Sequence, residues 1–312
     1  MKALLAMHRE FLPGSNELAR LAAHAANMRI VFARLSHEYQ VNDSVSRFFG
    51  RGLEFEELRA YQPGDDVRSI DWRATARTGR PHVKKYREER QQVLILMLEV
   101  RKSMLFGSGQ TTKCAQAVRV AALLAYAMKH RHHRVGVLLW GDFGSLAIEP
   151  AAAADTLNRL LDALSGDAHS MNMLTGTITA DAGASDLIRY TERMPRGRKL
   201  AFISDFMQWQ ADEWQMIGRL RQRHETCAVQ ITDPREETMP DVGLARMTDM
   251  SGDDMIVVDS GSQACRDAYA ACWKRHLESL QQRLNEVAIP LRRISTRDGV
   301  AALTRHITDL AI

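Results

Sequence analysis

The chain has 312 residues, of which 45% are hydrophobic and 26% are charged. This length and composition allow one large or two modest domains with a real core, and they exclude a disordered chain. The 42 basic and 38 acidic residues leave a formal net charge of only +4, an excess too thin to indicate nucleic acid or an anionic membrane as the partner.

The cysteines and the apolar runs further limit the kinds of site and the cellular location that the sequence allows. The four cysteines lie far apart and form no Cys-x-x-Cys pair, so the sequence predicts neither a zinc site nor a disulfide framework. His8, Arg9 and Glu10 interrupt the N-terminal apolar run, and no run approaches the roughly 18 apolar residues of a membrane-spanning helix. We therefore expect a cytoplasmic protein without membrane insertion.

The N-terminal region, residues 1–45, reads as a helical arm. Apolar residues recur at steps of three and four over residues 18–39, which predicts an amphipathic helix. Ser15 or Asn16 is the expected cap. Basic residues do not cluster opposite the apolar face, so we interpret the helix as a packing element.

Residues 46–90 predict a small β-rich subdomain. Two β-prone pieces, 55–60 and 81–87, flank a turn at Pro63-Gly64 and a helical turn over 73–77 that ends at Gly79. A basic run follows, in which Lys84, Lys85, Arg87 and Arg90 would form a nucleic-acid footprint if they shared one exposed face. Two glutamates interrupt the run and it contains only one aromatic residue for stacking, so we do not favour this alternative.

Residues 91–312 alternate strand and helix, which predicts a mostly parallel α/β sheet with a C-terminal helical extension. A hairpin over 134–148 is expected to add an antiparallel edge strand. The other expected strands are 93–99, 199–203, 226–231, 255–258 as a short edge strand, and 290–295. The expected helices are 111–130, 151–164, 184–194, 213–224 and 263–287.

One stretch carries a specific resemblance. The run GLEFEELRAYQPGDDVRSIDWRATAR, followed by an apolar strand, resembles the signature of the bacterial family called domain of unknown function 58. Its matching residues are Arg59, Tyr61, Gly64, Asp65, Asp66, Arg68, Asp71, Trp72 and Arg77. The resemblance implies a von Willebrand factor A-like doubly wound sheet after a small N-terminal helix and β-rich subdomain, and a MoxR-type AAA+ ATPase as partner.

The charges of this signature are mixed in sign, which favours a structural network. Its arginines supply enough partners for its aspartates to form a polar latch that docks the subdomain onto the sheet. If this network is buried, Asp71→Ala or Arg77→Ala should each cost about 3 kcal/mol or more.

A candidate site lies at the carboxyl ends of the strands, where doubly wound sheets gather their ligands. It comprises Glu99, Arg101, Lys102, Ser103, Thr177 and Asp205. The resemblance implies a divalent-cation site here, with Glu99, Ser103, Thr177 and Asp205 as the ligands if Mg²⁺ is bound. Arg101 and Lys102 add positive charge where the cation would lie, so we expect a degenerate site and no cofactor.

The leading interpretation is a non-enzymatic protein-interaction and assembly factor that acts with the MoxR-type ATPase, as the resemblance implies. Arg101 would either capture an acidic residue of the partner or pair internally with Asp205. The alternatives are a metal-dependent ligand-binding domain, a hydrolase built on Ser103 and Asp205, and a nucleic-acid binder.

Overall fold

The computed structural model describes residues 12–26, 28, 53–62, 67, 70–88, 92–129, 133–142, 144–165, 190–248 and 255–308. The chain divides into a large unit, Met1–Glu38 with Gln92–Ile312, and a small unit, Tyr39–Gln91. The three-part division expected at 45 and 90 stays a prediction.

The small unit contains a two-stranded antiparallel sheet and one short helix. Strand β1 (Leu53–Ala60) pairs with β2 (His82–Glu88), and α3 (Trp72–Thr78) lies between them in the sequence. The carboxylate of Asp71 caps α3 by accepting hydrogen bonds from the backbone N–H groups of Arg73 and Ala74, at 2.9 and 3.1 Å. Gly79 ends the helix at a positive φ of 70°, as expected.

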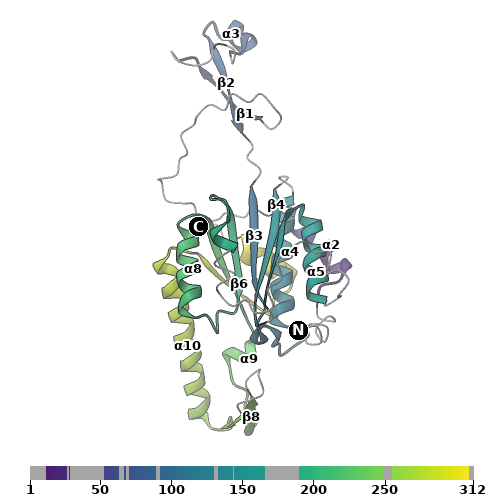
Figure 1. Ribbon diagram of the computed structural model, residues 1–312, viewed down its shortest axis with the longest axis vertical. Coiled ribbons are helices and arrows are strands. Elements are labelled where there is room, and N and C mark those ends of the chain that lie inside the picture. Colours follow the sequence, from purple (N-terminus) through teal and green to yellow (C-terminus); the bar gives the residue numbers. More distant parts are fainter. Residues whose placement is uncertain are drawn as a thin grey trace. The chain divides into compact units, whose positions relative to one another are not determined.

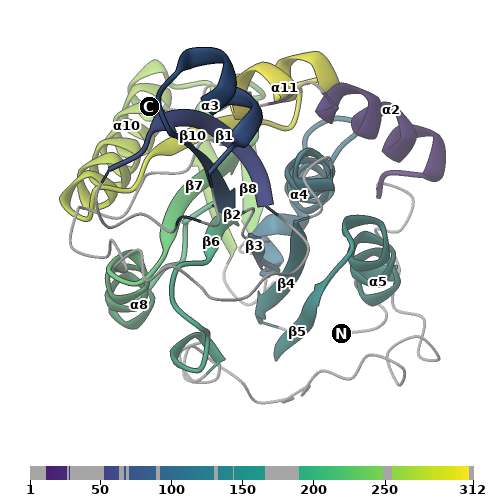
Figure 2. The ribbon, with the colours of Figure 1, turned by 90° about the horizontal axis from the view of Figure 1, so that it is seen from above.

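The large unit is built on a six-stranded sheet with the order β10-β7-β6-β3-β4-β5 (Figures 1 and 2). All neighbours are parallel except β4 and β5, so the antiparallel edge strand is confirmed. The strands are β3 (Val93–Glu99), β4 (Arg134–Gly141), β5 (Gly144–Ala151), β6 (Lys199–Ser204), β7 (Glu225–Thr232) and β10 (Leu291–Ser295). The chain runs from β3 to β4 and β5 on one side, then returns to β6 on the other, so the strand order reverses between β3 and β6.

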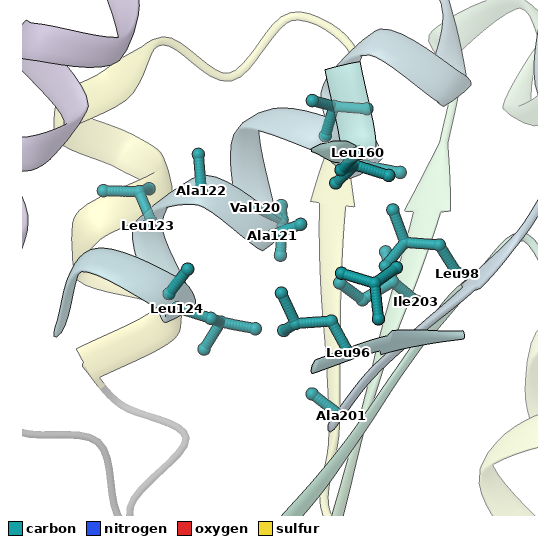
Figure 3. Close-up of a cluster of buried hydrophobic side chains, with 14 of the residues drawn as sticks. Leu96, Leu98, Val120, Ala121, Ala122, Leu123, Leu124, Leu160, Ala201 and Ile203 are labelled. Atoms are coloured by element: carbon teal, nitrogen blue, oxygen red, sulfur yellow. The ribbon is translucent and has the colours of Figure 1, made fainter. Parts of the chain in front are cut away.

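Helices cover both faces of this sheet, which explains why its central strands are continuous apolar runs. One face packs against α2 (Ser15–Ala25), α4 (Lys113–Lys129), α5 (Ala153–Ser165) and α11 (Val300–Thr308). The other face packs against α8 (Ala211–Arg221) and α10 (Gln263–Glu286). Alternate residues of β3 enter the two cores: Leu96 and Leu98 pack with α4 (Figure 3), whereas Ile95 and Met97 face α8.

Three expectations about helices need correction. The N-terminal helix ends at Ala25, and most of the remaining expected span lies outside the described residues. Gly14 is its N-cap, without a side-chain hydrogen bond, so neither Ser15 nor Asn16 has the expected role. The sequence predicts one apolar face for the C-terminal helix, formed by Tyr269, Trp273, Leu277, Leu280 and Leu284. In α10 only Leu280 and Leu284 of this face are buried, because the first half of the helix extends past the core.

The segment at 255–258 does not join the main sheet. Strand β9 (Met255–Asp259) pairs instead with β8 (Leu244–Thr248) in a separate antiparallel hairpin, because β10 occupies the edge beside β7. The short helices η4 (Lys102–Leu105) and α9 (Pro234–Glu237) follow β3 and β7 directly. Within the described part of the chain, no helix combines the length and apolarity that crossing a membrane requires.

Candidate functional site

The carboxyl ends of β3 and β6 lie beside each other at the reversal of strand order. Glu99 is the last residue of β3, and Asp205 follows β6 directly. Around them lies a group of charged side chains that we call the strand-end cluster, namely Glu99, Arg101, Lys113, Asp205, Glu213 and Glu236. Switch points of this kind are where open α/β sheets bind ligands.

Glu99 lies at the centre of a buried hydrogen-bond network. Its side chain is fully buried, and its Oε2 accepts a hydrogen bond from the Ser204 hydroxyl and one from Trp209 Nε1 at 3.1 Å. Burial is the main cause that raises its pKa to about 7, and the nearby Asp205 carboxylate raises it further, whereas Arg101 acts in the opposite direction. Glu99 therefore titrates near neutral pH.

Arg101 has different partners from the expected one. Its Nε lies 3.0 Å from Glu99 Oε1, a second guanidinium nitrogen pairs with Glu213, and a third donates to the Gln208 carbonyl at 2.7 Å. Glu213 is positioned for this contact because it also accepts from the N–H of Gln210 at the start of α8, at 2.7 Å. The predicted pair with Asp205 is absent, and the Arg101 side chain is only 14% exposed.

Asp205 forms its ion pair with Lys113. The ammonium Nζ lies 2.7 Å from Asp205 Oδ2 and also pairs with Glu236, and the lysine side chain is 0% exposed. Burial alone would lower the pKa of Lys113, but the two carboxylates outweigh it and raise the pKa. The sequence reasoning missed this residue, although a lysine in the first turn of a helix opposes the helix dipole and thus signals a carboxylate partner.

This arrangement does not fit the divalent cation that the resemblance implies. Asp205 Oδ2 already contacts the Lys113 ammonium, and its Oδ1 accepts the backbone N–H of Met207 at 3.0 Å. Ser103 Oγ is buried and has no hydrogen-bond partner among the described residues, and Thr177 lies outside them. No group of three or more His, Cys, Asp or Glu residues in the described ranges is arranged to hold a metal.

Further hydrogen bonds tie the neighbouring loops to the same edge. Asp233, after β7, accepts from the N–H of Ser108 at 3.0 Å and from Thr296 Oγ1 at 2.7 Å. The backbone N–H of Lys102 donates to Asp142 at 2.7 Å. A Cβ at Gly107 would lie 2.4 Å from the carbonyl oxygen of Thr111, so the turn before α4 requires glycine. The edge is therefore fixed from β4 to β10.

The signature residues of the small unit are only partly described. Four signature residues lie outside the described residues, namely Gly64, Asp65, Asp66 and Arg68, and only the backbone of Arg59 is described. In the basic run, only the backbone of Lys84, Lys85 and Arg87 is described, and Arg90 lies outside the described residues. Tyr61 is half-buried, and its N–H donates to the Pro81 carbonyl at 2.9 Å. Trp72 is 69% exposed and Arg77 is exposed, so these two side chains do not belong to a buried latch within the small unit.

Comparison with known proteins gives relatives from bacteria. Uncharacterized proteins of Mycobacterium bovis and Mycobacterium tuberculosis are 27% identical to this chain over 301 residues, which cover 95% of this chain and 92% of each relative. An uncharacterized protein of Mycobacterium avium is 28% identical over 130 residues, 40% of this chain and 73% of that protein. The family model described as "Protein of unknown function DUF58" matches residues 57–279. Since this match covers more than half of the sequence, the chain belongs to the DUF58 family of proteins.

Proposed function

We propose that the chain is a non-enzymatic interaction and assembly factor that acts with a MoxR-type AAA+ ATPase. Its docking edge is the carboxyl end of a von Willebrand A-like sheet. The strand order, with the antiparallel edge strand β5 and the reversal between β3 and β6, supports this fold assignment. The ATPase partner comes from the resemblance that the signature carries.

The observation that carries the proposal is the internal pairing of the strand-end charges. Lys113 pairs with both Asp205 and Glu236, and Arg101 pairs with both Glu99 and Glu213. Carboxylate oxygens that already pair with these cations are poorly placed to bind a metal. The same ion pairs hold the loops that follow the strands in place. A rigid edge loses little conformational entropy when it binds a protein.

The same geometry disfavours a hydrolase at this position. A serine nucleophile needs a base within hydrogen-bond reach, and Ser103 Oγ has no such partner among the described residues. Met207, which follows Asp205, is 42% exposed and thus presents an apolar side chain at the proposed edge. Exposed apolar groups on a rigid polar frame suit protein docking.

Affinity purification of the tagged full chain from its native cells, with and without ATP, tests the proposal. We expect an AAA+ ATPase among the proteins identified by mass spectrometry, and we expect Met207→Lys to reduce its recovery. Glu192→Lys is the matched control, because Glu192 is exposed and lies before β6, toward the opposite end of the strands. Absence of an AAA+ ATPase from the wild-type sample would overturn the proposal, whereas equal recovery with both variants would overturn the assignment of the edge.

A further inference from the structure

The hairpin β8–β9 exposes an unusual amount of apolar surface. Eight large hydrophobic side chains are exposed in the described residues, and five of them belong to this hairpin or directly precede it. They are Val242 (64%), Leu244 (76%), Met255 (58%), Ile256 (58%) and Val257 (62%). Figure 1 shows the hairpin beyond α9, past the carboxyl ends of the main strands. Met255 and Val257 lie on one face of the hairpin and Ile256 on the other, so both faces expose apolar side chains. Exposed apolar side chains gathered in one element mark an interaction site.

Each strand of the hairpin also has an open edge. Antiparallel pairing joins Leu244 to Asp259 and Thr248 to Met255, and no third strand among the described residues extends this sheet. The backbone N–H and C=O groups along the outer edges are therefore a template for another strand. Both strands are short, and a two-stranded sheet gains stability when further strands join it.

The two open edges differ in charge. In β8 the central residue is Arg246, which is exposed, so a twofold antiparallel pairing of β8 with its own copy would bring two arginines opposite each other. In β9 the first four residues are uncharged and apolar, without lysine or proline, and Asp259 comes last. Edge strands that avoid pairing usually carry such protective residues, and β9 lacks them.

The register that pairs all five residues of β9 with their copies is the one centred on Val257. A twofold axis at Val257 places this residue opposite its own copy, and Ile256 opposite Val258. Met255 then faces Asp259, so no like charges oppose each other anywhere along the five residues. The β9 edge is thus self-complementary, and the β8 edge is not.

The base of the hairpin is held in place before any pairing occurs. Ser260 Oγ donates to the Gly243 carbonyl at 2.7 Å and accepts the N–H of Val242 at 3.1 Å. Asp241 lies 3.2 Å from an Arg266 nitrogen, and the same arginine donates to the Ser260 carbonyl at 2.6 Å. A preformed strand loses little conformational entropy when it pairs.

We propose that β9 is a homodimerisation strand: the β9 edges of two copies of this chain pair antiparallel about Val257 and form a continuous four-stranded sheet. Backbone hydrogen bonds across the new pair stabilise the dimer, and the uncharged side chains allow the register centred on Val257. This inference does not depend on the proposed ATPase partner.

Sedimentation velocity of the full chain over a concentration series up to about 100 µM tests the pairing. We expect a reversible dimer, and we expect Val257→Lys to raise its dissociation constant at least about ten-fold, because two lysines then face each other. The control is Leu244→Lys, at a position on β8 that is also exposed, which should leave the dimer intact. A chain that stays monomeric throughout, or a dimer that Val257→Lys leaves unchanged, overturns the proposal.

A cross-linking experiment tests the register directly. Cys265 and Cys272 are not buried, so both are first replaced by serine. Opposed residues of an antiparallel pair have Cα atoms about 4.5–5.5 Å apart, a separation that a disulfide can span, so Val257→Cys should form covalent dimers on mild oxidation. Arg246→Cys, at the residue that would oppose its own copy in a β8 pair, should not. Cross-linking through Arg246→Cys alone would assign the contact to β8 and overturn the role of β9.

Discussion

The strand-end cluster of the large unit and helix α3 of the small unit both arise from charge-rich sequence, but their environments are opposite. Lys113 is 0% exposed and lies between two carboxylates, whereas Arg77 of α3 is exposed. Trp72, beside the capping residue Asp71, is 69% exposed. The density of charges along the sequence therefore does not predict which charges are buried. Burial determines how much each charged side chain contributes to the free energy of unfolding.

The energetic reason is desolvation. A charge that leaves water loses several kcal/mol of hydration, which only close partners of opposite sign can offset. Removal of one partner then leaves the other buried and uncompensated. At the surface, water compensates the remaining charge, and the same substitution has little effect. The two regions should therefore respond very differently to matched substitutions.

The largest effect is expected for Lys113→Met, which keeps the length of the side chain but leaves Asp205 and Glu236 without their cation. The free energy of unfolding should fall by about 3–5 kcal/mol in denaturant titrations. The control is Lys102→Met at a partly exposed lysine of the same edge, which should stay within about 0.5 kcal/mol of wild type. The double variant Lys113→Met with Asp205→Asn should recover part of the loss, and no recovery would mean that the pair is not the cause.

Arg101→Met should have the next largest effect, since Glu99 and Glu213 would both lose their shared cation. We expect a loss of about 2–3 kcal/mol, less than for Lys113 because the arginine side chain is 14% exposed and water reaches it. Thermal unfolding followed by circular dichroism measures this change. Wild-type stability of the variant would show that the two contacts contribute nothing.

The pH dependence of stability tests Glu99. Its pKa is about 7 in the folded protein and 4.5 as the ordinary value, so the folded state binds the proton more tightly than the unfolded state. The resulting stabilisation is complete below pH 4.5 and is lost as the pH rises through 7, with a total change of about 3 kcal/mol. The free energy of unfolding should thus fall with pH in wild type relative to Glu99→Gln.

This comparison has a built-in control. Burial lowers the pKa of His224 to about 4, so its stabilising contribution is present above pH 6.5 and is lost as the pH falls toward 4. Both proteins contain His224, and its contribution therefore cancels in their difference. A difference between wild type and Glu99→Gln that stays constant from pH 4.5 to 8 would contradict the raised pKa of Glu99.

The smallest effects are expected in α3. Asp71→Ala should cost about 1 kcal/mol because it removes the cap of the helix, and Arg77→Ala should change stability by less than about 0.5 kcal/mol. A network that docking of the small unit buries would instead give the 3 kcal/mol or more expected from the sequence, and that alternative stays a prediction. Because the chain divides into two compact units, the measurement needs a probe in the small unit, such as the amide hydrogen exchange of α3. A large loss for Arg77→Ala would restore the buried network.

The sequence by itself determined the α/β class and most elements of the large unit. Continuous apolar runs correctly located β3, β4, β6 and β7, because a strand covered on both faces must be apolar throughout. The alternation of strands and helices also placed Glu99 and Asp205 at the same edge. In the small unit, Gly79 and the β-prone pieces located α3, β1 and β2 for local reasons of backbone geometry.

Only the tertiary structure decided which charges meet and which elements stay outside the sheet. Lys113 pairs with residues 92 and 123 positions away, and Arg101 pairs with a residue 112 positions away. No local pattern encodes such distances, since they depend on which strand ends and helix starts converge. The hairpin β8–β9 shows the same limit: the sequence predicted a strand at 255–258 but not its partner β8. The exclusion of this hairpin from the main sheet follows from competition with β10 for the edge of β7. The periodicity of a segment shows which of its faces can be buried. The packing of the whole unit determines which other elements that segment contacts.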